Sequence, residues 1–357
     1  MPKNLVLCCD GTANKYGTTN TNVVHLCYTL IQDPTQLAYY HPGLGTMGAP
    51  GAWTRFGQWM SQLLGQALGR GLPDDIRDAY VFLMKNFEPG DRIFLFGFSR
   101  GAYTVRALAG MLSMFGLIRN GNEPLVPYAV QLLTKLDDHT FQVARDFKRT
   151  FSMPCDTYFV GVWDTVSSVG WFRNPLTIPY SGDNPGIEIG RHAISIDERR
   201  AFFRSNLWVR NAGMSDHGPK DVKQVWFAGV HCDVGGGYLD TESGLSKIAL
   251  EWMLREAQTA GLKCQQARID EVLGKTAGSA YCRPDPTAPV HCSLTPRWWL
   301  AEFVPKRHFD WPTHTWRRRM NLFRRRTVPA ASLIHTSALH RANYHPKNIP
   351  DVYTEVR

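Results

Sequence analysis

Short runs of consecutive apolar residues alternate along the chain with stretches in which apolar residues recur at helical spacing. The runs are too short to be buried helices, and they lie at 5–9, 92–96, 157–163 and 223–230. The stretches with helical spacing lie at 22–31, 74–87, 105–117 and 245–260. Strands that are apolar throughout are typical of a parallel sheet covered on both faces. The pattern therefore predicts an α/β fold with a mostly parallel central sheet and helices on both faces.

Three stretches lack this regularity. Residues 43–57 are rich in glycine and aromatic residues, which predicts a long surface loop. Residues 171–220 and 265–330 hold scattered proline, glycine and tryptophan, and we expect them to be irregular insertions around the sheet. The chain has 357 residues, of which 43% are hydrophobic, so that it can bury a large core. We therefore expect one domain over residues 1–357 rather than separate domains.

The chain carries no sequence signal for a membrane span or for export. It contains no apolar run of about 18 residues, which a membrane-spanning helix needs, and its start leads into a predicted strand without the parts of a signal peptide. The eight cysteines include no C-x-x-C pair, and most lie in apolar stretches, which indicates reduced, buried thiols. We therefore expect a cytoplasmic protein, while secretion by a route that needs no signal peptide stays open.

The segment FLFGFSRGAYTVRALAG at 94–110 takes a predicted strand straight into a predicted helix. It contains Ser99 between Gly97 and Gly101, which is the G-x-S-x-G pattern of a nucleophile elbow, where a sharp turn exposes the hydroxyl. The two glycines would let the backbone turn and let neighbouring segments approach. The simpler alternative is that Ser99 is an ordinary turn residue.

Two further predicted strands end at polar residues that fit the same chemistry. Asp164 follows the strand at 157–163, and His231 follows the strand at 223–230. The order Ser99, Asp164, His231 is the chain order of α/β-hydrolase triads, and the carboxyl ends of parallel strands meet at one edge of a sheet. In such a triad the histidine takes the proton of the serine while the acid fixes the histidine's tautomer. The sequence therefore predicts a serine hydrolase.

A hydrolase of this kind also needs backbone N–H groups that stabilise an oxyanion. The helix that begins near Arg100 directs its first N–H groups towards this place, so we expect the Arg100 N–H to be one donor. A second donor is expected from the backbone of Gly11 or Thr12 at the end of the first strand. We expect Asp10 to organise that turn rather than to take part in catalysis.

Other residues compete for the roles of acid and base. Asp233 lies two residues after His231, and we expect it to fix the glycine-rich loop that follows. Asp197 and Asp240 are further candidates for the acid, but Asp164 is preferred because it ends a strand of its own. A structural role of His231 beside the glycine-rich loop is the alternative to its role as base.

A divalent metal ion is the alternative use of these strand ends. Its ligands would be Asp10, Asp164, His231 and Asp233. This alternative leaves the turn around Ser99 unexplained. We therefore expect neither a metal nor another cofactor.

The net charge of +9 is unevenly placed, because arginines crowd one late stretch. A docking surface for anionic lipid head groups is one interpretation of this stretch, and a solvated face is the other. Tryptophans beside arginines, at 296–299 and 316–319, suit a lipid–water interface. Nucleic acid is not an expected partner. The arginines proposed for the lipid surface are Arg317, Arg318, Arg319, Arg324, Arg325 and Arg326.

Several long segments resemble the uncharacterised α/β-hydrolase domain family that includes the type VI secretion phospholipase effectors. They include LVLCCDGTANKYG at the start, GFSRGAYTVRALAG, GVWDTVSSVG and FAGVHCDVGGGY. HAISIDERRAFF, GLSKIALEWML and the tail HTSALHRANYHPKNIP extend the resemblance to about residue 350. It implies an α/β-hydrolase-like fold, and it aligns Ser99, Asp164 and His231 with the catalytic serine, aspartate and histidine of the family.

The resemblance also implies a substrate, because some members of the family cleave phospholipid acyl esters. We therefore expect a serine esterase or lipase that acts on an ester or lipid through a Ser–His–Asp acyl-enzyme mechanism. Hydrolysis of a soluble ester, a thioester or a peptide is an alternative, as is a non-catalytic binding protein on a hydrolase scaffold. Asp75 stands where the family's asparagine is expected, and the chain is little longer than the catalytic core. The resemblance thus implies hydrolase chemistry more strongly than the role of a secreted toxin.

Overall fold

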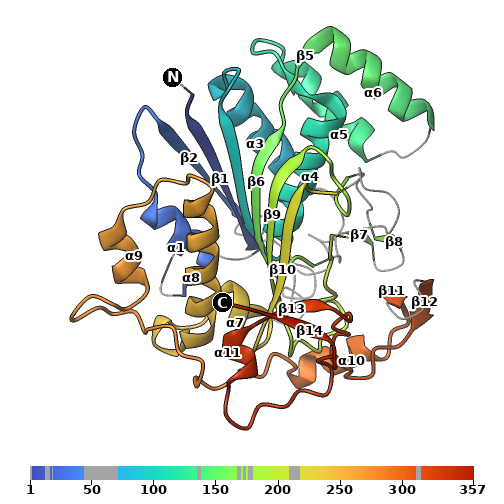
Figure 1. Ribbon diagram of the computed structural model, residues 1–357. Helices are drawn as coiled ribbons and strands as arrows, with labels where there is room; N and C mark the ends of the chain where they lie inside the picture. The colour runs from blue at the N-terminus through green and yellow to red at the C-terminus, as the bar shows by residue number, and fades with distance from the viewer. Residues whose placement is uncertain are drawn as a thin grey trace, which may run out of the picture.

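The central element of the fold is an eight-stranded sheet with the strand order β14-β13-β10-β9-β6-β3-β1-β2. All pairings between these strands are parallel, and helices cover both faces of the sheet (Figure 1). This arrangement confirms the predicted α/β-hydrolase-like architecture. The computed structural model describes residues 2–12, 17, 19–43, 71–134, 138–166, 170–171, 174–175, 180–208, 218–310 and 315–357.

The elements in these ranges have the following bounds. The strands of the central sheet are β1 (Asn4–Thr12), β2 (Gln36–Gly43), β3 (Arg92–Phe98), β6 (Thr157–Trp163), β9 (Ile187–Ser195), β10 (Asp221–Phe227), β13 (Ser332–His335) and β14 (Tyr353–Val356). Three pairs of short strands lie outside this sheet, namely β4 (Leu117–Ile118) with β5 (Ser152–Met153), β7 (Gly170–Trp171) with β8 (Asn174–Pro175), and β11 (Lys306–Asp310) with β12 (Thr315–Arg319). The α-helices are α1 (Asn22–Thr29), α3 (Leu72–Asn86), α4 (Arg100–Phe115), α5 (Val126–Leu133), α6 (Asp138–Phe151), α7 (His231–Gly235), α8 (Gly244–Thr259), α9 (Gln266–Val272), α10 (Pro296–Glu302) and α11 (Thr336–Leu339). Two 3-10 helices are η1 (Glu123–Leu125) and η2 (Asp240–Glu242).

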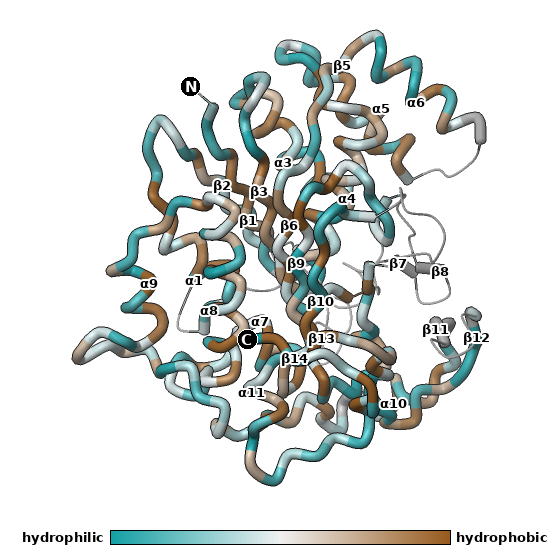
Figure 2. Tube along the Cα trace, in the orientation of Figure 1, coloured by the Kyte–Doolittle hydropathy of each residue, from teal (hydrophilic) through white to brown (hydrophobic). Residues whose placement is uncertain are grey.

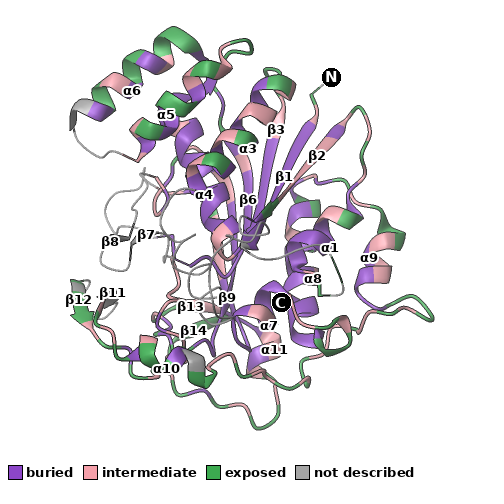
Figure 3. Cartoon of the chain, turned by 180° about the vertical axis from the view of Figure 1, so that it is seen from behind, coloured by how far each residue is buried: buried purple, intermediate pink, exposed green. Residues whose placement is uncertain are grey.

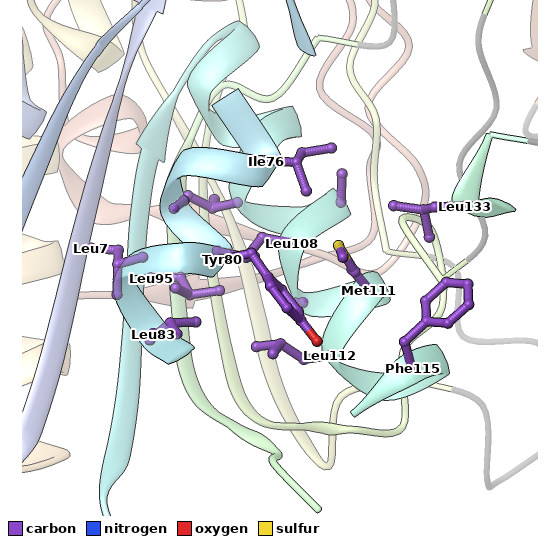
Figure 4. Packing of buried hydrophobic residues seen from close by; sticks show 14 of the residues in the cluster. Leu7, Ile76, Tyr80, Leu83, Leu95, Leu108, Met111, Leu112, Phe115 and Leu133 are labelled. Atoms are coloured by element: carbon purple, nitrogen blue, oxygen red, sulfur yellow. The ribbon is translucent and has the colours of Figure 1, made fainter. Parts of the chain in front are cut away.

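The sheet has a hydrophobic core on each face. Successive side chains of β1 point to opposite faces, so Leu5 and Leu7 join one core while Val6 and Cys8 join the other. The first core is closed by α3, α4, α5 and α6, and Tyr80 lies in its middle among leucines (Figure 4). The second is closed by α1, α8 and α9. Burial on both faces explains why most residues of β1, β3 and β6 are apolar (Figures 2 and 3).

β9 is an interior strand of the sheet that the hydrophobic pattern did not predict. It lies between β6 and β10, inside the stretch 171–220 that was expected to be an insertion. Its apolar pattern is broken by Arg191 and His192, which are both buried. Arg191 is neutralised by ion pairs of 2.6 Å with Asp221 and with Glu256. The charge of Arg191 is thus balanced by acids that are distant in sequence.

Other expectations concern the chain outside the sheet. The predicted loop at 43–57 lies, after Gly43, outside the described residues. The stretch 265–330 contributes α9 to the second core and also contains α10 and the β11–β12 pair. All eight cysteines are free thiols. None of the described helices is both long and apolar enough to span a bilayer.

Candidate active site

Ser99 lies at the junction of β3 and α4 in an unusual backbone conformation. Its φ of 59° and ψ of −117° lie in a region that is strained for a residue other than glycine. A Cβ atom on Gly97 would come within 2.5 Å of the Gly101 carbonyl oxygen, and one on Gly101 would overlap the carbonyl oxygen of Cys9. The two glycines therefore allow a sharp strand-to-helix turn that packs against the end of β1.

Asp164 and His231 are brought into direct contact at the carboxyl ends of the strands. Asp164 follows β6, His231 is the first residue of α7, and His231 Nδ1 lies 2.5 Å from Asp164 Oδ2. Both residues are buried. The Ser99 N–H donates to the carbonyl of Trp163 at 3.1 Å, and the ring of Phe98 lies 4.5 Å from the His231 ring. The turn at Ser99 is therefore next to the aspartate–histidine pair.

The side chain of Ser99 does not complete this pair into a hydrogen-bonded chain. Among the described residues, no hydrogen bond joins the Ser99 hydroxyl to His231. The contact with Asp164 occupies Nδ1 of His231, so Nε2 is the ring nitrogen that is left to accept a proton. Without substrate such catalytic hydrogen bonds are often long, and they shorten when substrate binds.

Arg326 is buried against the Asp164 carboxylate, contrary to the expectation that it belongs to a lipid-docking surface. Its Nη1 donates to Asp164 Oδ1 at 2.5 Å and its Nη2 donates to Oδ2 at 3.0 Å. Ser195 donates to the same carboxylate from its backbone N–H and its hydroxyl. Burial would raise the pKa of Asp164, but Arg326 and His231 outweigh it and hold that pKa well below its ordinary value. The surface assignment is therefore wrong for Arg326, because its charge is used inside the protein.

His231 is surrounded by an aromatic ring and a second carboxylate. The Phe203 ring lies edge-on at 4.8 Å, and Glu198 accepts the His231 backbone N–H at 3.2 Å. Burial would raise the pKa of Glu198, but its pairing with Arg200 lowers it to about 2. Burial also lowers the pKa of His231, although Asp164 opposes this shift. His231 is therefore neutral near neutral pH and able to accept a proton.

Asp233, the competing candidate for the acid, pairs with another histidine. His291 Nδ1 lies 2.6 Å from Asp233 Oδ1, and Asp233 Oδ2 accepts the backbone N–H groups of Val230 and His291. The ring of Tyr238 stacks on His291 with 3.8 Å between the ring centroids. None of the bonds of Asp233 within the described ranges goes to His231. Asp233 thus ties the segment at His291 to the start of α7.

The remaining acids considered for the triad have partners elsewhere. Asp197 Oδ2 accepts the hydroxyl of Tyr344 at 2.6 Å. Asp240 Oδ1 lies 3.1 Å from His25 Nε2 and 3.2 Å from Lys247 Nζ. In the part of the chain that the structure describes, no three or more histidines, cysteines and acids gather in a way that could hold a metal ion.

Asp10 organises the turn at the end of β1. Its Oδ1 accepts the N–H of Gly11 at 2.7 Å, and its Oδ2 accepts the hydroxyls of Thr21 at 2.8 Å and Tyr40 at 3.0 Å. The Gly11 N–H is therefore occupied and does not point to a substrate in this structure. Of the two residues expected to supply the second oxyanion donor, Thr12 is the one that remains.

The other arginines of the basic stretch lie outside the site. Arg319 is half-buried, and the Nη1 of Arg325 lies 3.5 Å from the carboxylate of Asp197. The exposed ones are Arg317, Arg318, Arg324 and Arg325.

Three polar residues that hydrogen-bond to Asp164 or His231 were not assigned to the site from the sequence. Arg326 was counted with the basic stretch, and nothing in a run of arginines marks one of them as buried. Ser195 and Glu198 lie in HAISIDERRAFF, a segment that contributed to the family resemblance. The resemblance of this segment to the family could therefore have pointed to these two residues, although it does not predict which residues they contact.

Two comparisons by sequence place the chain among known proteins. Residues 3–256 match the family described as "T6SS, Phospholipase effector Tle1-like, catalytic domain". The Uncharacterized protein YEL023C of Saccharomyces cerevisiae (strain ATCC 204508 / S288c) is 38% identical over 220 residues, which are 57% of this chain and 32% of that protein.

Two solved structures share part of their length with this chain. The crystal structure of an uncharacterized protein from Pseudomonas aeruginosa has a TM-score of 0.43 and 19% identity over 75% of this chain and 47% of its own. The structure of the Tle1 effector bound to the VgrG spike of the type 6 secretion system has a TM-score of 0.39 and 18% identity over 66% of this chain and 51% of its own. The chain thus spans about half of each of these proteins and about a third of the yeast protein. Because the family match covers more than half of the sequence, the chain belongs to the family of Tle1-like phospholipase effector catalytic domains of type VI secretion.

Proposed function

We propose that the chain hydrolyses the acyl esters of phospholipids, with Ser99 as the nucleophile, His231 as the base and Asp164 as the acid that orients it. Membership of a phospholipase effector family supports a lipid ester as substrate. The observation that carries the mechanism is the 2.5 Å contact between His231 Nδ1 and Asp164 Oδ2 beside the strained turn at Ser99. A strained serine next to a buried aspartate–histidine pair is the arrangement that acyl transfer needs.

The reaction proceeds in two acyl transfers. Ser99 Oγ attacks the ester carbonyl carbon while His231 Nε2 takes the hydroxyl proton, which gives a tetrahedral oxyanion. The carbon–oxygen bond to the lysophospholipid then breaks, and His231 gives the proton to the departing alkoxide. A water molecule attacks the acyl-Ser99 ester with His231 again as base, which releases the fatty acid and regenerates the serine.

Backbone N–H groups at the turn would stabilise the oxyanion. Arg100 is the first residue of α4, so its N–H has no partner within the helix, and the N-terminal end of a helix favours negative charge. The second donor in this proposal is the N–H of Thr12, since that of Gly11 is bonded to Asp10.

Arg326 acts in this proposal as a positioning residue. Its two Nη atoms bind both oxygens of Asp164, which fixes the plane of the carboxylate and hence the direction of the bond to His231. Nε of Arg326 donates to the carbonyl of Phe203 at 2.9 Å, and Phe203 packs on the His231 ring. Arg326 therefore fixes both neighbours of the proposed base.

The substrate class is tested by fatty-acid release from vesicles of single phospholipids and from short soluble acyl esters. We expect the wild-type protein to release fatty acid from phospholipids, and folded Ser99→Ala protein to lose this activity by on the order of 10³-fold or more. Turnover of soluble esters alone would change the proposed substrate to a soluble ester. Turnover of neither substrate by a folded wild-type protein would contradict hydrolysis and favour a binding protein on a hydrolase scaffold.

A further inference from the structure

Exposed apolar side chains gather on one part of the surface. Five of the twelve exposed large hydrophobic residues in the described part of the chain lie between residues 299 and 322. Leu300 is 77% exposed, and Trp299 and Phe303 are 51% and 52% exposed. We call this set the apolar platform, and its members are Trp299, Leu300, Phe303, Met320 and Leu322.

The two segments that carry the apolar platform, α10 and the loop after β12, pack against each other. The ring of Phe323 lies 6.1 Å from that of Trp299 and 5.8 Å from that of Phe303, so the loop after β12 packs on α10. The carboxylate of Glu302 is fully buried and accepts the side-chain amide of Asn321 at 2.5 Å and the N–H of Phe323 at 3.0 Å. Buried hydrogen bonds therefore hold α10 and this loop together while their apolar side chains face outwards.

α10 also connects the apolar platform to the proposed active site. Trp298 is buried on the side of α10 that faces the interior, and its ring lies 5.5 Å from that of Phe203. Phe203 in turn lies 4.8 Å from the ring of His231. The ring of Phe203 thus lies between the proposed base and Trp298 of α10, the helix that also carries Trp299 and Leu300. α10 lies on the same side of the molecule as α7 (Figures 1 and 3).

The charge around the apolar platform indicates what it binds. Residues 296–326 contain nine arginines and lysines and two acidic residues. Arg326 is buried against Asp164 and is not part of the surface charge, while Arg317, Arg318, Arg324 and Arg325 are exposed. Glu302, one of the two acids, is buried in hydrogen bonds. The exposed Arg318 and Arg324 lie two residues from Met320 and Leu322, respectively. An apolar surface with basic residues at its border complements a layer that is apolar inside and negatively charged outside.

We propose that the apolar platform docks the protein on an anionic phospholipid surface, with Trp299, Leu300 and Phe303 entering the acyl region and the arginines binding the head groups. This docking would bring lipid to the side of His231, and to that extent it rests on the proposed function. Such docking depends on both parts of the surface, because the apolar side chains give affinity for the layer and the arginines give preference for negative charge. Salt weakens the second contribution and spares the first.

The test is sedimentation of the full chain with vesicles of phosphatidylcholine alone or mixed with phosphatidylglycerol. We expect the wild-type protein to bind the mixed vesicles, and the variant Trp299→Ser/Leu300→Ser/Phe303→Ser to bind them at least about 10-fold more weakly. Leu239→Ser/Val352→Ser is the matched control, since Leu239 and Val352 are 48% and 66% exposed outside the apolar platform. This control should bind as the wild type does. Leu300→Ser alone, at the most exposed position, should give a smaller loss in the same direction.

Three results would overturn this inference. In the first, the wild-type protein does not bind the mixed vesicles. In the second, the triple variant and Leu300→Ser bind them as tightly as the wild type does. In the third, the matched control loses as much vesicle binding as the triple variant. If the wild-type protein does not bind vesicles but is a dimer in sedimentation equilibrium, and the triple variant is a monomer, the surface would be a protein interface instead. Failure of the proposed function can be distinguished from failure of this inference, because vesicle binding can be measured in the same protein even when it hydrolyses no ester.

Discussion

Two aspartate–histidine pairs in the described part of the chain have nearly equal lengths, and they differ in what surrounds them. His231 Nδ1 is 2.5 Å from Asp164, and His291 Nδ1 is 2.6 Å from Asp233. Arg326 lies against Asp164 and keeps the pKa of that acid low, whereas burial of Asp233 raises its pKa despite its hydrogen bonds to His291 and to backbone N–H groups. The side chain of His231 is 4% exposed and that of His291 is 22% exposed.

The distance between an acid and a histidine therefore does not by itself identify a catalytic pair. The pair of Asp164 and His231 lies beside a strained serine and is backed by a buried cation. The pair of Asp233 and His291 holds a loop and has a stacked tyrosine, Tyr238, over the imidazole. In our account the first pair carries the chemistry and the second is structural, and each prediction below tests this division.

The largest expected effect separates the two histidines. His231→Ala should lower kcat by up to about 10⁶-fold, as removal of a triad histidine does in other serine hydrolases. His291→Ala should lower it by less than about 10-fold, because it removes a loop contact and no reacting group. Fatty-acid release from phospholipid vesicles measures both.

The combination of His231→Ala with Ser99→Ala controls for the mechanism. It should be scarcely worse than either change alone, since members of a triad act as a unit. Multiplied losses would mean that the two residues act in different steps. A larger loss from His291→Ala than from His231→Ala would reverse the division between the pairs.

The next effect separates the two acids. Asp164→Asn should lower kcat by about 10⁴-fold, because an amide cannot hold the histidine in the tautomer that accepts the serine proton. Asp233→Asn should leave most activity and lower the melting temperature, since Asp233 accepts two backbone N–H groups. If instead Asp233→Asn were the more damaging change in kcat, Asp233 would be the acid.

A smaller effect is expected from a change of Arg326, the buried cation that contacts Asp164. Arg326→Met should lower the free energy of unfolding by about 3–5 kcal/mol, because it leaves the charge of Asp164 less compensated in the interior. It should also move the acid limb of the pH profile of kcat/KM upwards by on the order of one pH unit, because loss of a nearby positive charge stabilises the imidazolium of His231.

Arg191 offers a matched control for this change. It is also buried and pairs with Asp221 and Glu256, away from the proposed site. Arg191→Met should cost similar stability without moving the acid limb. Equal shifts of the limb in both variants, or no shift in Arg326→Met, would leave Arg326 without a specific effect on His231.

The smallest effect is the position of the acid limb in the wild-type protein. Burial lowers the pKa of His231 below its ordinary value of about 6.5, and the residue must be neutral to accept a proton. Activity should therefore persist as the pH falls below 6.5 and be lost at a lower midpoint. The unfolded chain binds this proton first, so the same group should make the free energy of unfolding fall as the pH drops below about 6.5. A midpoint above 6.5 in kcat/KM would contradict the buried, neutral histidine.

Half of the strands of the sheet could be predicted from the sequence, because they contain runs of apolar residues. β1, β3, β6 and β10 each overlap a predicted apolar run, and α4 follows the predicted turn. β9 was not predicted because Arg191 and His192 interrupt its apolar pattern, and the acids that neutralise Arg191 lie far away in sequence. Tertiary partners of this kind are not visible in a local pattern.

The contacts within the candidate site could be predicted less completely than the location of the site. Strand ends and chain order placed Asp164 and His231 at one edge, and the structure shows them in contact. The partner of Asp164 was not predictable, because Arg326 lies 162 residues away and inside a basic stretch. The hydrogen bond from the N–H of Gly11, one of the two expected oxyanion donors, to the side chain of Asp10 was likewise not predictable from the backbone pattern.

The central claim is that Ser99 is a nucleophile activated by the pair of His231 and Asp164, and reaction with a fluorophosphonate tests it most directly. Intact-mass and peptide mass spectrometry should show one label per folded wild-type chain, located on Ser99. Labelling should continue in His291→Ala and be lost in His231→Ala and Ser99→Ala. A folded wild-type protein that takes no label, or a label that persists in Ser99→Ala, would contradict the account.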